Sequence, residues 1–293
     1  MSLALTLPVI LAVLFGAFLH ASWNALVKSS TDKPLDTALI HVLGGAIGLP
    51  LVLLAGLPPY ESMPYLAASI IIHIGYYVAL AGAYKHGDLG LTYPIMRGTA
   101  PLLVAIVSGM AIGEQLSMSG WLGVAAISAG VLMLGVSRTM FASRAHRSAL
   151  AFALGNAVII AVYTVVDGLG VRVATEHGGN ALQYVAALFL IDGIPYFLFV
   201  MSQRKDAQRE IAWSYMRGRW PLALLGMLAS LGSYGIALWA MTQTPVATVA
   251  ALREVSVLFA ALLGAIFLKE KFGLQRGFGT LFILSGIAGL RLA

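Results

Sequence analysis

Two arginines, Arg97 and Arg253, stand about two helical turns inside long apolar stretches of the sequence. If those stretches cross a membrane, each charge costs at least about 2.5–3.5 kcal/mol on insertion scales, and charges kept at that cost usually serve a function. Arginine keeps its charge and offers a fork of donors that fits a carboxylate. We therefore expect the two arginines to bind a substrate carboxylate or to gate one mouth each. The alternative is a structural pairing with an acid or with helix-end carbonyls.

Other polar and aromatic side chains recur at helical spacing in further apolar stretches. Tyrosine and tryptophan rings can stack on a flat, partly apolar solute while their polar groups form hydrogen bonds. For any single aromatic residue, helix packing or an interfacial belt is the competing interpretation. The remaining candidates for binding a solute are Trp23, Asn24, His73, Tyr76, Tyr77, Tyr93, Tyr163, Asp167, Tyr234, Trp239 and Ser256.

Gating or coupling to an ion needs groups that change charge, and histidine does so near neutral pH. Glu114 and Glu270 each stand at a predicted helix end, which favours a structural or gate-capping role. The gating and coupling candidates are His20, Glu254, Glu114 and Glu270, with His41, His73, Asp167 and Asp192 as further groups that could titrate.

The sequence gives no sign of a cofactor. It has no cysteine, and its histidines do not follow a zinc-binding spacing. It also lacks a Walker A motif, a nucleophile elbow and a glycine-rich phosphate loop. We therefore expect neither a metal nor ATP-driven transport by this chain, and we do not expect an enzyme.

The fourth apolar stretch contains Pro94, Gly98 and Pro101. Proline removes a backbone donor and clashes with the preceding turn of a helix. The pattern predicts either a broken helix, whose carbonyls near Tyr93 and Arg97 would face a solute, or a simple kink.

The composition defines the class of protein that must hold these groups. Of 293 residues, 59% are hydrophobic and only 10% are charged, with a mean hydropathy of +0.89. A soluble domain has about a quarter charged residues, so these values exclude a soluble enzyme and a disordered chain. We interpret the net charge of +6 as that of cytoplasmic loops, not of a nucleic-acid binder.

Ten stretches are long and apolar enough to cross a bilayer as helices. The first is interpreted as a retained span, because no basic region or cleavage site of a signal peptide accompanies it. The longest connection, residues 202–219, is basic and partly apolar and is predicted to lie along the lipid headgroups. The predicted spans are 5–27, 36–56, 64–84, 91–112, 118–137, 150–172, 181–201, 220–241, 246–267 and 273–291.

The basic residues predict an orientation in an inner cell membrane. Of eighteen lysines and arginines, only Arg172 and Arg291 fall among the even-numbered connections and the termini, and only Arg97 and Arg253 fall inside spans. The odd-numbered connections therefore hold the rest and should be cytoplasmic. With ten spans, both termini should lie on the periplasmic or extracellular side.

The chain also repeats itself. Residues 93–134 align without gaps with residues 249–290 at an offset of 156, which pairs Arg97 with Arg253 and Glu114 with Glu270. Each half, 1–148 and 149–293, would hold five spans, and because five is odd the halves must have opposite topology. Inverted repeats are typical of secondary transporters that alternate access to a midplane site. One chain of ten spans can form a complete pathway, which favours a functional monomer.

These segments carry a family resemblance. "SWNALVK" near the end of the first span and "GEQLSMSGWLGVAAISAGVLML" after the fourth are similar to segments that recur in the EamA-type ten-span exporters of the drug/metabolite transporter superfamily. The resemblance covers nearly the whole chain and implies export of small metabolites, often amino acids. Within the family, the chain resembles the branch of YddG-type aromatic amino-acid exporters. Small multidrug transporters of the same superfamily carry an acid in their first span, whereas residues 1–27 contain none.

The sequence thus predicts an all-α integral membrane protein of two inverted five-helix repeats. We expect it to export aromatic or neutral amino acids through a central cavity, with the lipid bilayer and the solute as partners. A multidrug exporter of lipophilic cations with the same fold is the first alternative. A membrane-embedded enzyme acting on lipids is the second, although the sequence has no DxxD or HxxxH pattern. A channel is disfavoured because the polar faces are aromatic and lack rings of charge.

Overall fold

The structure is a computed structural model that describes residues 5–86, 89–135, 144–268 and 273–293. Every regular element in these ranges is a helix, as the sequence predicts. Glu270, one of the gating candidates, lies outside the described residues. The helices are α1 (Leu7–Lys28), α2 (Lys33–Ala55), the short 3-10 helix η1 (Tyr60–Ser62), α3 (Met63–His86), α4 (Leu89–Ile112), α5 (Met118–Gly135), α6 (Arg144–Glu176), α7 (Ala181–Ser202), α8 (Asp206–Met241), α9 (Val246–Arg253), α10 (Val255–Leu268) and α11 (Leu274–Arg291).

The helices follow the predicted spans closely, with α9 and α10 together occupying the ninth. Seven candidate membrane spans are long and apolar enough to cross a bilayer within the described residues, among them all of α1, α2, α7 and α8. The helices α3, α5 and α11 stand at the positions of the other three predicted spans. The protein is therefore a multi-pass membrane protein by the length and composition of its helices.

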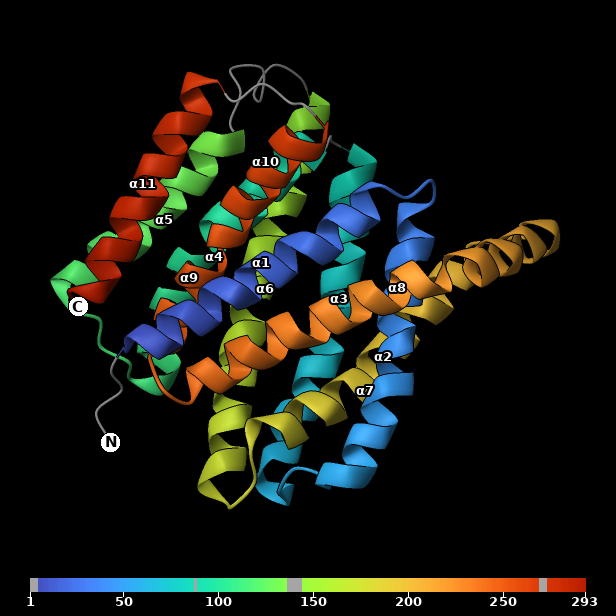
Figure 1. Ribbon diagram of the computed structural model, residues 1–293, viewed down its shortest axis with the longest axis horizontal. Coiled ribbons are helices and arrows are strands. Elements are labelled where there is room, and N and C mark those ends of the chain that lie inside the picture. The colour runs from blue at the N-terminus through green and yellow to red at the C-terminus, as the bar shows by residue number, and fades with distance from the viewer. Residues whose placement is uncertain (1–4, 87–88, 136–143, 269–272) are drawn as a thin grey trace.

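Helices from the two halves of the chain pair across the molecule (Figure 1). Helix α5 packs along α11, and α2 packs along α7. Helices α1 and α8 lie side by side across the front of the view in Figure 1, and α3 packs against α6. Helix α4 contacts α5, α6 and α9, so it lies at the centre of the arrangement.

The pairing of α5 with α11 depends on glycines. A Cβ atom on Gly123 would lie 2.9 Å from the carbonyl oxygen of Gly286, and one on Gly130 would lie 2.6 Å from that of Gly279. The early glycine of α5 thus meets the late glycine of α11, so the two helices run antiparallel. Small residues at such positions let helix backbones approach closely.

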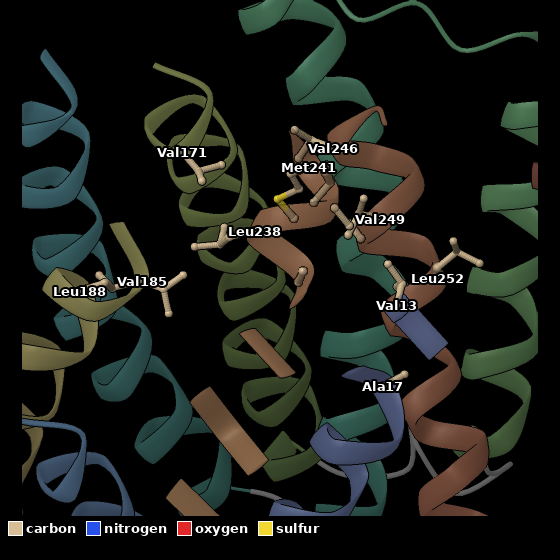
Figure 2. Close-up of a cluster of buried hydrophobic side chains, with 14 of the residues drawn as sticks. Val13, Ala17, Val171, Val185, Leu188, Leu238, Met241, Val246, Val249 and Leu252 are labelled. Carbon is tan, nitrogen blue, oxygen red and sulfur yellow. The ribbon is translucent and has the colours of Figure 1, made fainter. Parts of the chain in front are cut away.

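An apolar cluster fills the region where α1, α6, α7, α8 and α9 meet (Figure 2). Its residues are nearly inaccessible to solvent, including Leu238 and Met241 of α8 and Val246 of α9. Gly168 of α6 makes room for this contact, because a Cβ there would lie 2.7 Å from the side chain of Val246. The cluster fixes α9, which carries Arg253 at its C-terminal end.

For the span with Pro94, Gly98 and Pro101, the sequence left a broken helix and a simple kink open. Helix α4 is continuous through Pro94 and Pro101, so the broken helix is excluded there. The interruption lies instead in the equivalent span of the second half, at Glu254 between α9 and α10. There the backbone forms tight three-residue turns, with Glu254 N donating to Ala251 O and Val257 N donating to Glu254 O, each at 3.0 Å.

The connection 202–219 was predicted to lie along the lipid headgroups. Most of it belongs to helix α8, one helix of 36 residues that begins at Asp206 and continues through the next predicted span. Its N-terminal part projects beyond the neighbouring helices at the right of Figure 1. Because Ile211 and Trp213 are exposed on it, the apolar and basic character seen in the sequence belongs to a helical extension.

Candidate functional site

The break between α9 and α10 brings an acid to Arg97. The Nε atom of Arg97 on α4 lies 2.9 Å from Oε2 of Glu254, and its NH2 group donates to Ser256 Oγ at 3.5 Å. Arg97 is 7% exposed and Glu254 is 4% exposed, so the ion pair is buried. The Nε–H bond does not point along the line to the carboxylate, and both atoms remain without a regular hydrogen bond.

Arg253 has different surroundings although it is the repeat equivalent of Arg97. Its guanidinium carbon lies 5.1 Å from the centre of the Tyr234 ring on α8. The residue is 9% exposed, and its Nε atom has no hydrogen-bond partner. Among the described residues, no carboxylate lies within ion-pair distance of it. Adjacent Glu254 turns toward Arg97 because neighbouring helix positions point in different directions.

Asp167 on α6 was predicted to contact the solute, but the structure surrounds it with tyrosines. Its Oδ1 atom accepts a hydrogen bond from Tyr184 on α7 at 3.0 Å, and its Oδ2 atom accepts one from Tyr234. Asp167 is fully buried. The carboxylate therefore fixes the Tyr234 phenol, and the ring of that tyrosine in turn faces Arg253.

A second polar cluster joins α2, α3 and α7. Tyr77 donates to Oδ2 of Asp192 at 2.9 Å. The Nδ1 atom of His41 lies 4.0 Å from Oδ2, and that of His73 lies 3.9 Å from Oδ1. The Tyr196 ring stacks on the Tyr77 ring at 4.3 Å. We call these five residues the Asp192 cluster.

Aromatic rings connect the Asp192 cluster to the arginines. The His73 ring lies against that of Tyr163 of α6, with ring centres 4.4 Å apart and the ring planes tilted by 32°. Tyr76 lies edge-on to both Tyr163 and Tyr77. Tyr76, Tyr93, Tyr163 and Tyr234 also pack around one buried cluster of α4 and α6 side chains. The structure thus brings most of the predicted aromatic site residues into one region.

The first span places His20, Trp23 and Asn24 in contact with one another. Trp23 donates from its indole nitrogen to Nδ1 of His20 at 3.3 Å, and its ring meets that of His41 edge-on. The Asn24 amide donates to the His20 carbonyl of its own helix. Trp239 of α8 is 40% exposed, which sets it apart from the buried tyrosines.

Glu114, which follows α4, binds both Arg172 near the end of α6 and the start of α9. Its Oε1 atom lies 2.6 Å from the NH2 group of Arg172 on α6, and the backbone nitrogen of Val246 donates to both carboxylate oxygens, at 2.9 and 3.0 Å. Arg172 also donates to the carbonyls of Met241 and Thr244. Glu114 therefore caps the N-terminus of α9, where a negative charge is stabilising.

Sequence reasoning missed part of this arrangement. The second and seventh spans contain none of the residues predicted to bind the solute, yet they supply His41, Asp192 and Tyr184. The signal was an ionisable group inside an apolar stretch. His41 and Asp192 were noticed for that reason, but no periodicity showed that they would meet. Among the described residues, no group of three or more histidines or acids is arranged to hold a metal ion.

The long apolar helices and their buried charges define a multi-pass membrane protein, and comparison with known proteins refines that class. Residues 147–292, which span the second half of the chain, match the model of the EamA-like transporter family. That family indicates a membrane transporter of small molecules.

The fold itself recurs among solved structures. One crystal structure aligns over 96% of this chain and 95% of its own, with a TM-score of 0.74 and 22% sequence identity. At that identity the similarity concerns the fold alone. A comparison with curated proteins finds no match.

Proposed function

We propose that the protein is a secondary transporter that exports aromatic or neutral amino acids by alternating access through a central cavity. The solute carboxylate binds Arg253, and the solute side chain lies among Tyr76, Tyr93, Tyr163 and Tyr234. This assignment extends the family-level conclusion to a class of solute and to named residues.

The observation that carries this proposal is the unequal pairing of the buried charges. Arg97 and Arg253 face one carboxylate between them, and that carboxylate is bound to Arg97. Asp167, another buried acid, already accepts hydrogen bonds from two tyrosines. A buried cation without an anion is costly, so the Arg253 guanidinium favours a solute that brings a carboxylate.

Aromatic or neutral side chains suit the rest of the surroundings. The tyrosine rings offer flat apolar faces on which another ring can stack. Tyr234 is held by Asp167, so its ring keeps one position beside Arg253. A rigid ring next to an arginine can order both ends of an aromatic amino acid at once.

Alternating access requires the two halves to be inverted repeats, and the helix pairing is consistent with that organisation. Under the offset of 156, the contact of Gly123 with Gly286 becomes that of Gly279 with Gly130, and both contacts are present. An antiparallel pair of equivalent helices is expected when two five-helix halves cross the bilayer in opposite directions.

The ends of the helices agree with the proposed orientation. Arg291 donates to the Leu5 carbonyl, so the beginning of α1 and the end of α11 share one face. The even-numbered connections also meet one another there, since Gln183 donates to the Ala55 carbonyl. On the other face, Arg204 pairs with Asp32 at 2.6 Å. We assign the face with Arg204 to the cytoplasm because basic connections stay inside.

Export of lipophilic cations is the competing function. A cation exporter needs a membrane-embedded acid that is available to the solute. Glu254 and Asp167, the buried acids at this site, are engaged by Arg97 and by two tyrosines, respectively. Neither acid is therefore available to a cationic solute, and the unpaired Arg253 guanidinium would repel one.

The test is an exchange assay in proteoliposomes, in which each of the twenty amino acids inside the vesicle drives entry of radiolabelled phenylalanine. We expect exchange with aromatic and neutral amino acids and its loss in Arg253→Ala. Losing a charge-assisted hydrogen bond costs about 1.5–3 kcal/mol, or about 10- to 150-fold in affinity. Arg209→Ala, on the exposed part of α8, is the matched control. Wild-type exchange in Arg253→Ala, or exchange of lipophilic cations alone, would refute the proposal.

A further inference from the structure

The Asp192 cluster contains a carboxylate of its own, so it does not suit binding of the carboxylate of a solute. Asp192 and His41 come from α7 and α2, which pack so closely that a Cβ on Gly193 would overlap the His41 carbonyl. The side chains of Asp192, His41 and His73 are only 12–16% exposed. Burying an acid and two imidazoles together in a membrane protein is costly unless the group serves a purpose.

The hydrogen bonds of His73 indicate which atom could accept a proton. Its Nδ1 atom lies 2.9 Å from the carbonyl oxygen of Ser69. A carbonyl can only accept, so Nδ1 carries the hydrogen and donates it. The other ring nitrogen, Nε2, then holds the lone pair in the neutral imidazole, and binding of a proton there makes an imidazolium. The Asp192 carboxylate, whose Oδ1 atom lacks a hydrogen-bond partner, would stabilise that cation.

Few other ionisable groups face Asp192. On α2 it meets His41, on α3 it meets His73 and Tyr77, and on its own helix Tyr196 stacks behind Tyr77.

Asp167 of α6 is a further acid near the cluster. It interacts electrostatically with His73 and accepts hydrogen bonds from Tyr184 of α7 and Tyr234 of α8. On the side of α1, the Trp23 ring lies between His41 and His20. The cluster is therefore one carboxylate between two imidazoles.

We propose that the Asp192 cluster is a proton-binding site, distinct from the arginine site, that couples solute export to proton entry. One proton from the outside binds an imidazole of the cluster and leaves to the cytoplasm after the transporter has changed state, so no other co-reactant is required. The ring contact of His73 with Tyr163 joins the two sites, because a charge on the imidazole acts on a ring of the solute site. This inference rests on the proposed transport of amino acids and adds its driving ion.

The main experiment separates exchange from accumulation in proteoliposomes. Exchange of radiolabelled phenylalanine needs no net proton movement, whereas accumulation into vesicles with an acidic interior does. We expect Asp192→Asn and His41→Gln to lose accumulation and to keep exchange, and Arg253→Ala to lose both. Asp206→Asn and His177→Gln, which alter exposed residues, are matched controls and should keep both. Accumulation that persists in Asp192→Asn, or exchange lost together with accumulation, would overturn the coupling role.

A second measurement needs no solute. The Trp23 and His41 rings lie 6.0 Å apart, so protonation of His41 should quench Trp23 fluorescence as the pH is lowered. We expect this change in wild type, its loss in His41→Gln and Trp23→Phe, and an altered midpoint in Asp192→Asn. A flat profile in wild type would overturn the proton site even if phenylalanine is exchanged. Absence of exchange with an intact fluorescence change would instead remove the proposed solute and leave the proton site.

Discussion

At the scale of single residues, Arg97 and Arg253, which align in the sequence repeat, have different partners. Arg97 neutralises Glu254 inside the protein, whereas Arg253 rests on the Tyr234 ring and lacks an acidic partner among the described residues. A buried ion pair stabilises little in total, but removing one member leaves a charge that nothing compensates. The two arginines should therefore respond differently to the same substitution.

We expect Arg97→Ala to destabilise the protein by about 3–5 kcal/mol, because it leaves Glu254 buried and unpaired. Arg253→Ala removes a cation without exposing an acid, so its effect on stability should be much smaller. Thermal unfolding of the purified protein in detergent measures both. The double variant Arg97→Ala with Glu254→Ala should regain part of the lost stability. Equal losses for the two single variants would contradict this assignment of partners.

At the scale of the elements, close contacts between helix backbones determine where the functional side chains lie. Gly193 lets α7 approach the His41 carbonyl on α2, and Glu114 fixes the start of α9, whose last residue is Arg253. The glycines of α5 and α11 join the final helices of the two halves. Without a hydrophobic driving force between helices in lipid, such packing is what orders them.

Two glycines of α11 allow a matched test of this packing. A Cβ on Gly279 would lie 2.9 Å from the carbonyl oxygen of Gly130, whereas one on Gly277 would meet nothing within 4 Å. We expect Gly279→Ala to lower the unfolding temperature, because the backbones must separate. Gly277→Ala should leave that temperature unchanged or raise it, since alanine favours a helix by about 1 kcal/mol over glycine. Equal effects in thermal unfolding would show that the close contact does not matter.

At the scale of the whole molecule, the pairing of equivalent helices and the distribution of basic residues are expected of two halves that face opposite ways. Inverted topology makes a sharp prediction for the turns that follow the first helix of each half, after α1 and α6. The turn after α1 should lie in the cytoplasm and the turn after α6 outside. Because the chain has no cysteine, single cysteines can report on each turn without removing any other.

We expect a membrane-impermeant maleimide to label His177→Cys in intact cells and to label Thr31→Cys only after the membrane is opened. Both positions are exposed in the structure, so access to the reagent depends on the side of the membrane. Labelling of both variants in intact cells would place the two turns on the same side. That result would exclude the inverted arrangement and, with it, the proposed mechanism.

The sequence by itself determined the features that depend on local composition. Length and apolarity of the stretches predicted most of the helices to within a few residues, because a bilayer-spanning helix must satisfy its own backbone and present apolar side chains. Charges inside those stretches identified Arg97, Arg253 and Asp167 as notable for the same reason. The family resemblance agrees with the match of the second half to EamA-like transporters.

Only the tertiary structure decided which of these charges meet. The break at Glu254, the tyrosines around Asp167 and the joining of His41 with Asp192 involve residues from different helices, in the last case about 150 positions apart. Periodicity along one helix gives the face on which a residue stands, but not which helix packs against that face. Those contacts depend on how the helices pack. Glycines such as Gly193 determine that packing, because they let two helix backbones approach closely.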